Sequence, residues 1–408
     1  MTADDRFVVA TYVVEDEEKQ LRKRADGIAI GLTVGSWTDL PATKQERMRP
    51  YCGRVEDIAV EERLPDGRVR ARVAIGYPTV NFPARIPALL TTVFGKLSMD
   101  GKIRMVGLDL PASFARAFPG PKFGAAGVRE VLGVQGRPLL MSIFKSCIGL
   151  PMDELVAAFT EQALGGADLI KDDEIFFNES LASPEDRVRA YREAARRTEA
   201  ETGQRVLYAV NLTGPVTELR DRARRLAELG AGALLVNAFA YGLDVLQALA
   251  EDPEVSVPIM AHPAVAGAMY AAPGYGISAS ILFGQLLRLA GADIVIYPSP
   301  YGTVTLEAEE SRQVLHHLRA DNGLKPALPA PSAGIHPGLV PLLVRDFGMD
   351  VIVNAGGGIH GHPGGARAGA RAFMAAIRAV VAGRPLREAA EDSPELAAAI
   401  QQWGVKEA

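Results

Sequence analysis

The sequence predicts an α/β protein in which a (β/α)8 TIM barrel, residues 136–408, follows a smaller α+β domain, residues 1–135. Two observations favour the barrel. After about residue 135, buried apolar stretches of strand length alternate with amphipathic helical stretches, and eight such alternations fit a closed barrel better than an open doubly wound sheet. No Gly-x-Gly-x-x-Gly turn follows the first of these strands, which disfavours a dinucleotide-binding fold.

The N-terminal domain shows strand and helix patterns without regular alternation. Residues 7–14 are rich in β-branched side chains, and residues 68–75 alternate polar and apolar, as a half-exposed strand does. The predicted elements are a strand at 7–14, a helix at 16–30, a strand at 68–75, a helix at 86–94, a glycine-bounded turn at 95–101 and a strand at 102–110. The proline and glycine cluster at 118–124 is predicted to lead out of this domain.

The barrel elements follow from the alternation itself. The predicted strands are residues 138–143, 167–171, 206–211, 233–237, 257–261, 293–297, 327–331 and 350–354. The helices predicted between them include residues 152–163, 184–202, 216–229, 277–290 and 338–347. Residues 367–383 supply the eighth helix, and we expect a helical extension from there to residue 408.

The composition is that of an ordinary globular chain of 408 residues, with 48% hydrophobic and 23% charged residues. A formal net charge of -5, without a basic cluster, argues against a nucleic-acid partner. Two cysteines, Cys52 and Cys147, are too few for a disulfide framework and indicate a reducing compartment. Because no apolar leader and no run of about 18 apolar residues occurs, we expect a cytoplasmic protein without a membrane partner.

Four ionisable residues, Lys171, Asp172, Asp173 and Glu174, come in succession where the second barrel strand is predicted to end. Three carboxylates repel one another and are costly to desolvate, so they are tolerable in open solvent or around a cation. The apolar residues 175–177 that follow favour the cation, and magnesium prefers carboxylate oxygens as ligands. Spacing alone leaves two interpretations open, a magnesium site and a solvated acidic turn.

Other polar residues follow the remaining strands at the same end of the barrel, where barrel enzymes carry their chemistry. Lys145 follows the first strand, Asn211 and Asn237 end the third and fourth, and His262 follows the fifth. A lone histidine is more often structural. At a barrel mouth, however, we favour a role for His262 that faces a ligand.

Glycines gather in the loops after the seventh and eighth strands, at residues 332–334 and 356–358. Backbone without side chains lets several N–H groups approach an anion, and barrels often hold a phosphate at these loops. A triple glycine alone is consistent with a simple tight turn, but the two loops together indicate a phosphate site. The residues therefore predict a magnesium enzyme acting on a small phosphorylated substrate that carries a carbonyl group.

Several strings in the chain resemble motifs of the RuBisCO large-chain superfamily. They are residues 171–174 (KDDE) with 164–168 (LGGAD) before them, residues 137–140 (RPLL) with Lys145, residues 332–334 (SAG), and residues 356–358 (GGG) with His362 and Pro363. Further strings are most similar to the RuBisCO-like enolases of methionine salvage: residues 31–41 (GLTVGSWTDLP), 88–98 (ALLTTVFGKLS), 298–302 (PSPYG) and 354–363 (NAGGGIHGHP). The resemblance covers essentially the whole chain.

The resemblance implies a specific active site. Lys171, carbamylated by CO2, would hold one Mg2+ per subunit together with Asp173 and Glu174, which leaves Asp172 either a part in supporting the ligands from behind or a structural part. The substrate would be bound by Lys145, His262, Gly334, Gly356 and Gly357. Backbone N–H groups of the last two glycines would hold its phosphate.

The same resemblance implies that Lys96 is the general base, which removes a proton from the phosphate-bearing carbon of a diketone to give the enol. A free lysine has a pKa near 10.4, so Lys96 would need a pKa about 2 to 3 units lower to act as a base. From its surroundings alone, Lys96 would be interpreted as a surface lysine in a loop. The N-terminal domain of one subunit would cover the barrel mouth of another, which places the active site at the interface of a homodimer.

The chain also departs from the carboxylating members of the superfamily. These need a lysine in the loop after the sixth strand and a glutamate in the N-terminal domain, whereas residues 298–306 contain no lysine and Gly31 stands at the place of the glutamate. We therefore expect enolisation without CO2 fixation. Two alternatives stay open: an isomerase or decarboxylase for another sugar phosphate, and a non-catalytic metabolite-binding protein, which would need neither the metal ligands nor the base.

Overall fold

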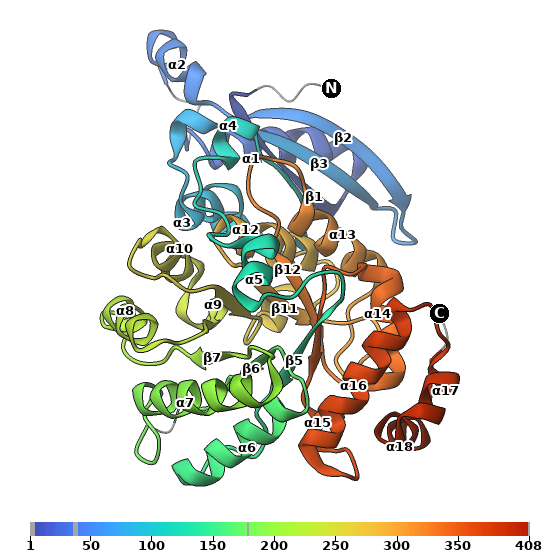
Figure 1. The fold of residues 1–408 in the computed structure, drawn as a ribbon. Helices are drawn as coiled ribbons and strands as arrows, with labels where there is room; N and C mark the ends of the chain where they lie inside the picture. Colours follow the sequence, from blue (N-terminus) through green and yellow to red (C-terminus); the bar gives the residue numbers. More distant parts are fainter. Residues whose placement is uncertain (1–4, 36–39, 178, 407–408) are drawn as a thin grey trace.

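The structure, a computed structural model, describes residues 5–35, 40–177 and 179–406, and over these ranges eight parallel strands form the larger sheet (Figure 1). They pair in the order β12-β11-β9-β8-β7-β6-β5-β13, and β12 packs against β13, so the sheet approaches a closed barrel. The strands are β5 (Leu139–Ile143), β6 (Leu169–Lys171), β7 (Leu207–Asn211), β8 (Ala233–Asn237), β9 (Ile259–His262), β11 (Ile294–Pro298), β12 (Leu328–Ser332) and β13 (Ile352–Ala355). Each lies within two residues of its predicted bounds, and the predicted barrel is confirmed.

The inside of the barrel is filled by apolar side chains, which alternate along the strands with side chains that pack against the helices. Helix α5 (Gly124–Leu132) adds Val128 and Leu132 to this interior core. Its Arg129 pairs with Asp350 at 2.8 Å, shortly before β13 begins, so α5 lies at the end of the barrel where the strands start. A ligand therefore has access from the opposite end, where the strands stop.

Helices surround the barrel, and α7 shows how the sequence sets their bounds. Ser183 accepts a hydrogen bond from the N–H of Asp186 (3.1 Å), Pro184 occupies the first turn, and Gly203 ends the helix in the left-handed conformation. The helices after the strands are α6 (Met152–Leu164), α7 (Pro184–Thr202), α8 (Leu219–Leu229), α9 (Ala238–Tyr241), α10 (Leu243–Glu251), α11 (Gly267–Tyr270), α12 (Leu287–Leu289), α13 (Ala308–Arg319), α14 (Val340–Phe347), α15 (Gly357–His360) and α16 (Gly365–Val381). The predicted helical extension is confirmed as α17 (Leu386–Ala389) and α18 (Pro394–Trp403).

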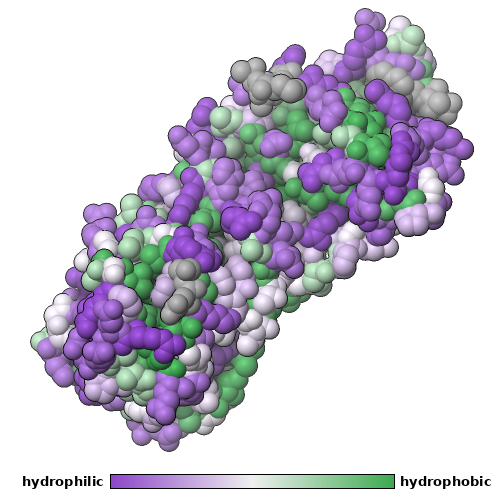
Figure 2. Space-filling model, turned by 90° about the vertical axis from the view of Figure 1, so that its right-hand side faces the viewer, coloured by the Kyte–Doolittle hydropathy of each residue, from purple (hydrophilic) through white to green (hydrophobic). Residues whose placement is uncertain are grey.

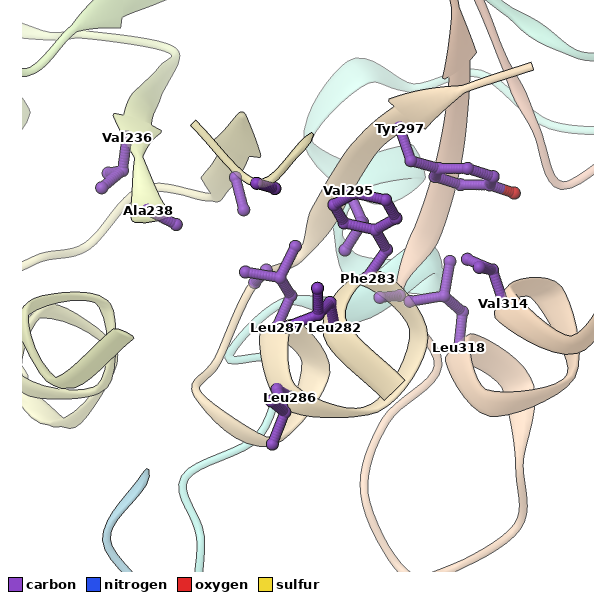
Figure 3. Packing of buried hydrophobic residues seen from close by; sticks show 14 of the residues in the cluster. Val236, Ala238, Leu282, Phe283, Leu286, Leu287, Val295, Tyr297, Val314 and Leu318 are labelled. Atoms are coloured by element: carbon purple, nitrogen blue, oxygen red, sulfur yellow. The ribbon is translucent and has the colours of Figure 1, made fainter. Parts of the chain in front are cut away.

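The helix predicted at residues 277–290 is wrong over its first turn. Gly276–Ile277 form strand β10, which pairs in parallel with β4 (Ile103–Asp109) of the N-terminal sheet. A π-helix, Ser280–Leu286, follows, and its Phe283 stacks on Tyr297 of β11 with ring centroids 6.3 Å apart (Figure 3). The apolar periodicity that predicted a helix is present, but Ile277, the first residue of the predicted range, belongs to the smaller sheet.

The smaller sheet pairs strands in the order β10-β4-β1-β3-β2. The remaining elements of the N-terminal part are β1 (Phe7–Asp16), β2 (Arg54–Arg63), β3 (Val69–Pro78), α1 (Leu21–Gly31), α2 (Ala42–Met48), α3 (Ile86–Leu90) and α4 (Ala112–Ala115). Strands β1, β3 and β4 confirm the predictions for residues 7–14, 68–75 and 102–110. Strand β2 was not predicted because it is an edge strand whose charged and mostly exposed side chains hide the alternation.

Two predictions for the N-terminal part need correction. The helix predicted at 16–30 begins as a 3-10 turn, Glu18–Gln20, and becomes α-helical only at Leu21. The turn predicted at 95–101 is wrong, because Lys96–Met99 form a 3-10 helix that continues a π-helical turn, Thr91–Gly95. Lys96 therefore lies on a helix instead of in a loop.

The two parts of the chain form an elongated molecule whose surface shows hydrophobic patches among hydrophilic residues (Figure 2). They are joined by the pairing of β10 with β4 and by ion pairs such as Arg85 with Glu251 (2.7 Å) and Arg104 with Glu310 (3.1 Å).

The division of the chain at residue 135 stays a prediction. Residues 1–4 and residues 36–39 of the string at 31–41 lie outside the described residues. Within the described ranges, no helix combines the length and apolarity that a membrane span requires.

Candidate active site

Four of the predicted site residues lie together where β5 and β6 end. Lys171 is the last residue of β6 and is fully buried, and its Nζ lies 3.6 Å from Oε2 of Glu174. Oδ2 of Asp173 accepts a hydrogen bond of 2.6 Å from Nζ of Lys145. The structure thus places two amines and two carboxylates in one cluster at the open end of the barrel.

Burial lowers the pKa of Lys171. The side chain has no exposed surface, and its Nζ donates a hydrogen bond of 2.8 Å to the backbone carbonyl of Asp172. Desolvation lowers the pKa of Lys171, although the nearby Glu174 and Asp173 oppose this effect. A neutral amine is the form that reacts with CO2, so this environment suits carbamylation better than an exposed lysine does.

Asp172 points away from this cluster into the wall of the barrel. Its carboxylate accepts hydrogen bonds from the guanidinium of Arg187 (3.0 Å), the hydroxyl of Tyr208 (2.7 Å) and the backbone N–H of Asn211 (2.9 Å). All the hydrogen bonds of this fully buried carboxylate are internal. Asp172 is therefore a structural residue, while Asp173 and Glu174 face the mouth.

Two asparagines hold the loop that carries Glu174. The side-chain amides of Asn211 and Asn237 both donate to the backbone carbonyl of Glu174, at 3.1 and 3.2 Å. Both asparagines end barrel strands, at β7 and β8, and both are buried. The sequence placed them at the correct end of the barrel, but their role in positioning Glu174 depends on a loop conformation that the sequence did not predict.

His262, at the end of β9, lies on the other side of Glu174. Its Nε2 is 3.4 Å from Oε2 of Glu174, and its Nδ1 accepts a hydrogen bond of 3.2 Å from the N–H of Ala264. Burial, together with the Lys171 and Lys145 cations, lowers the pKa of His262 to about 3, against the opposing effect of Asp173. The ring is therefore neutral at pH 7, and because Nδ1 accepts, Nε2 carries the proton that faces Glu174.

The predicted glycines border the same mouth from β12 and β13. A Cβ on Gly356 would lie 3.0 Å from Cε of Lys145, whereas a Cβ on Gly357 would meet no atom within 4 Å. Gly334 has φ +70° and lies against the backbone N of Thr303, so only glycine fits there without strain. Gly334 and Gly357 thus leave exposed backbone at these loops, as anion binding requires, while Gly356 is buried against Lys145.

Lys96 lies apart from the cluster. It is exposed on the N-terminal part, where it lines a cavity of about 510 Å³ with residues of α1. Across the described part of the chain, no hydrogen bond or ion pair joins Lys96 to the barrel residues. Within one chain the structure therefore brings together Lys145, Lys171, Asp173, Glu174, His262 and Gly356, places Gly334 and Gly357 in the loops after β12 and β13, and leaves the proposed base apart.

The ligand set for a metal ion depends on Lys171. Among the described residues, no three His, Cys, Asp or Glu side chains are grouped so that they could hold a metal ion. Asp173 and Glu174 supply two hard anionic oxygens, and a third would have to come from Lys171 as a carbamate. The residues present fit a carbamate-completed magnesium site and do not fit a site of unmodified side chains.

Comparison with known proteins agrees with the fold. Residues 1–114 match the N-terminal domain of the ribulose bisphosphate carboxylase large chain, and residues 124–403 match its catalytic domain. The chain belongs to the RuBisCO large-chain family. The superfamily resemblance predicted from the motifs is thereby confirmed.

Several curated relatives of this RuBisCO-family chain are named 2,3-diketo-5-methylthiopentyl-1-phosphate enolase. The chain is 55% identical over 410 residues to the 2,3-diketo-5-methylthiopentyl-1-phosphate enolase of Geobacillus kaustophilus, covering 98% of both chains. It is 53% identical over 401 residues to the enzyme of the same name from Bacillus velezensis, covering 98% of this chain and 99% of the relative. Such similarity over the full length makes this RuBisCO-like protein an enzyme.

Solved structures of the family superpose closely on the chain. A rubisco-like protein (MtnW) from Alicyclobacillus acidocaldarius has a TM-score of 0.95 and 59% identity, with 98% of this chain and 100% of that chain covered. A dimeric archaeal Rubisco from Hyperthermus butylicus has a TM-score of 0.87 and 30% identity, with 100% and 98% covered. The fold is therefore that of both the RuBisCO-like and the carboxylating branches.

Sequence reasoning missed three polar residues of this RuBisCO-like site. Arg187 and Tyr208 hold Asp172 from α7 and β7, and Asn354 is buried before the glycine triplet with neither side-chain amide atom hydrogen-bonded. The position of Asn354 beside the triplet was a usable signal. Arg187 has no such signal in the sequence. It lies in a helix rich in arginines, and only the folded structure shows which of them contacts Asp172.

Proposed function

We propose that this chain converts 2,3-diketo-5-methylthiopentyl-1-phosphate into 2-hydroxy-3-keto-5-methylthiopentenyl-1-phosphate, a step of methionine salvage, without fixing CO2. The observation that carries this proposal is the cluster of Lys145, Lys171, Asp173 and Glu174 at the barrel mouth. Several curated relatives that match over nearly the full length are named for that enolase. Enolisation requires a stabilised negative charge on oxygen and a base at the adjacent carbon, and the cluster supplies the first.

We further propose that Asp173, Glu174 and carbamylated Lys171 hold one Mg2+ per subunit, with CO2 bound as the carbamate. Two carboxylates and a buried lysine with a lowered pKa support this ligand set. When bound, the ion supplies Lewis-acid polarisation of the substrate's adjacent carbonyl oxygens, which makes the neighbouring C–H more acidic.

The remaining residues bind and orient the substrate. Backbone N–H groups near Gly334, Gly356 and Gly357 hold the phosphate, which fixes the phosphate-bearing carbon C1 beside the cluster. The Lys145 ammonium balances the negative charge that develops on the C2 oxygen. The neutral ring of His262 donates its Nε2 proton toward Glu174 or a substrate oxygen.

Proton transfer falls to Lys96. Its neutral Nζ takes a proton from C1, the C1–C2 double bond forms, and the C2 oxygen receives a proton to give the enol. Because Lys96 is remote from the cluster of its own chain, we propose that Lys96 of the partner subunit performs this step. The minimum functional unit is then a homodimer.

Exposed apolar side chains around the barrel mouth support this dimer. They lie in the loops after β5, β6, β7, β9 and β11 and are Ile148, Ile175, Phe177, Leu181, Val216, Val265 and Val304. Each is more than half exposed in the single chain. A ring of such residues around an active site favours coverage by a second subunit.

The direct test follows the ultraviolet absorbance of the conjugated enol. Purified protein is mixed with Mg2+, bicarbonate and the diketone phosphate, and the Geobacillus kaustophilus enzyme serves as the positive control. We expect an absorbance rise that depends on both Mg2+ and protein. Absence of the rise while the control enzyme works would refute the substrate assignment.

A further inference from the structure

Helix α18 is fastened to both glycine loops, although it lies at the end of the chain. The loop after β12 carries Gly334 and then His336, and the loop after β13 carries Gly357 and then His362. The ring of Trp403 lies 6.1 Å from that of His336, at an interplanar angle of 23°, and 6.5 Å from that of His362, at 50°. One indole thus contacts a side chain of each loop.

Hydrogen bonds tie the same helix to the loop after β13. The side-chain amide of Gln402 donates to the carbonyl of Gly361 (3.1 Å). His362 accepts at Nδ1 from the N–H of Gly364 (3.0 Å), so its Nε2 carries the proton and donates to the carbonyl of Glu395 (2.9 Å). The loop after β13 is therefore bonded to α18 near the start of the helix, at Glu395, and near its end, at Gln402.

The segment after α18 is tied to the other loop. The N–H of Lys406 donates to the carbonyl of Gly338 (3.1 Å), and a Cβ on Gly338 would lie 2.0 Å from the carbonyl oxygen of Gly404. The chain past Trp403 therefore packs directly on the segment that follows the β12 loop. Such close backbone contact leaves little freedom for this loop to move on its own.

The two glycine loops also contact each other. A shift of one loop therefore changes its distance from the other. A Cβ on Gly358 would lie 2.3 Å from the carbonyl oxygen of Ile335 and 3.1 Å from Cα of His336. Gly334 and Gly357, each one residue before this contact in its loop, are exposed, whereas Trp403 lies against His336 and His362. A change at the indole therefore alters the distance between the two exposed glycine backbones.

We propose that Trp403 is a positioning residue, which sets the spacing of the two glycine loops and thereby the affinity of the site for the substrate's phosphate group. This inference rests on the proposed function for the identity of the phosphate site. It assigns to the C-terminal helix a part in substrate binding in addition to any part in stability. Trp403 contacts neither substrate nor reacting atoms and acts through His336 and His362.

The test compares W403A and W403F with a matched control, Q401A, in the full-length protein. Gln401 is exposed two residues before Trp403 on the same helix, and its side chain makes no hydrogen bond to the other described residues. The measurements are the binding constant of inorganic phosphate by calorimetry, KM and kcat for the diketone phosphate, and the melting temperature. Q402A, which removes only the bond to Gly361, is the second variant if W403A does not fold.

We expect W403A to weaken phosphate binding and raise KM by the same factor, about tenfold, with kcat changed less, because misplaced loops lose binding before chemistry. W403F should restore both constants to within about twofold of wild type, and Q401A should equal wild type. A lower melting temperature with phosphate binding and KM unchanged would overturn the proposal, as would wild-type protein that binds no phosphate. Phosphate binding without turnover of the diketone would instead refute only the proposed function.

Discussion

Arg187 and Asp172 form a buried ion pair behind the active site, with Nη2 of Arg187 3.0 Å from Oδ2 of Asp172. Both side chains are almost fully inaccessible to solvent. The guanidinium also donates to the carbonyl of Ala182 and lies 4.1 Å from the ring of Phe176, so it holds both halves of the loop that carries Asp173 and Glu174. The carboxylate of Asp172, the first of three in succession, therefore points away from the mouth of the barrel.

Removal of this pair should destabilise the protein strongly. R187M leaves Asp172 charged and buried without its partner, and we expect the free energy of unfolding to fall by about 3 to 5 kcal/mol. The matched control is R189M, because Arg189 lies on the same helix and its ion pair with Asp186 is exposed. That variant should change the free energy by less than about 1 kcal/mol. Denaturant unfolding measures both, and equal losses would contradict the account.

The proposed sharing of the active site between two subunits makes a prediction for mixed dimers. K96A lacks the base and E174Q lacks a metal ligand, so each homodimer should be inactive while keeping its fold. In a heterodimer, the E174Q chain supplies Lys96 to the intact barrel of the K96A chain. Random exchange of subunits should therefore restore about a quarter of wild-type activity. Mixtures that stay inactive after subunit exchange would show that Lys96 does not act on the active site of the partner subunit.

Gly356 and Gly357 should respond differently to alanine. A Cβ at Gly356 displaces the flexible end of Lys145, so we expect G356A to fold normally with kcat reduced about tenfold. A Cβ at Gly357 enters open space and leaves Lys145 in place, so G357A should keep its kcat and change mainly KM. Steady-state kinetics distinguish the two, and identical kcat values would show that Lys145 does not depend on this contact.

Asp252 should contribute to acid sensitivity at a distance from the active site. Burial raises its pKa, but hydrogen bonds from Arg220 and Arg224 outweigh this and hold the pKa at about 2. Since the folded pKa lies below the ordinary value of 3.8, its contribution is complete above about pH 4 and is lost as the pH falls through 2. We expect wild type to lose about 1 to 2 kcal/mol more than D252N between pH 5 and pH 2. Parallel pH profiles of the two proteins would refute this.

The barrel was predictable because its signals are local. Each strand is a short apolar run buried on both faces, and the run that ends at Lys171 leads directly into the acidic cluster. Residues adjacent in sequence at the end of a parallel strand must lie at one end of the barrel. The metal-ligand candidates and the glycine loops therefore followed from sequence order once the strands were assigned.

The remainder depends on contacts between distant segments. Strand β10 forms because Gly276–Ile277 pair with the edge of a sheet whose other strands lie more than 160 residues earlier. Strand β2 lacks the alternation that marks a buried strand. The roles of Arg187 and Trp403 likewise come from segments that meet only in the fold. No local pattern distinguishes these side chains from other arginines and aromatic residues.

A crystal structure of the protein grown with Mg2+ and bicarbonate tests the central claim most directly. The account predicts that Nζ of Lys171 carries the additional atoms of a carbamate, and that the carbamate, Asp173 and Glu174 all contact one ion. Unmodified Lys171 with Asp173 and Glu174 turned away from each other and no ion between them would contradict it.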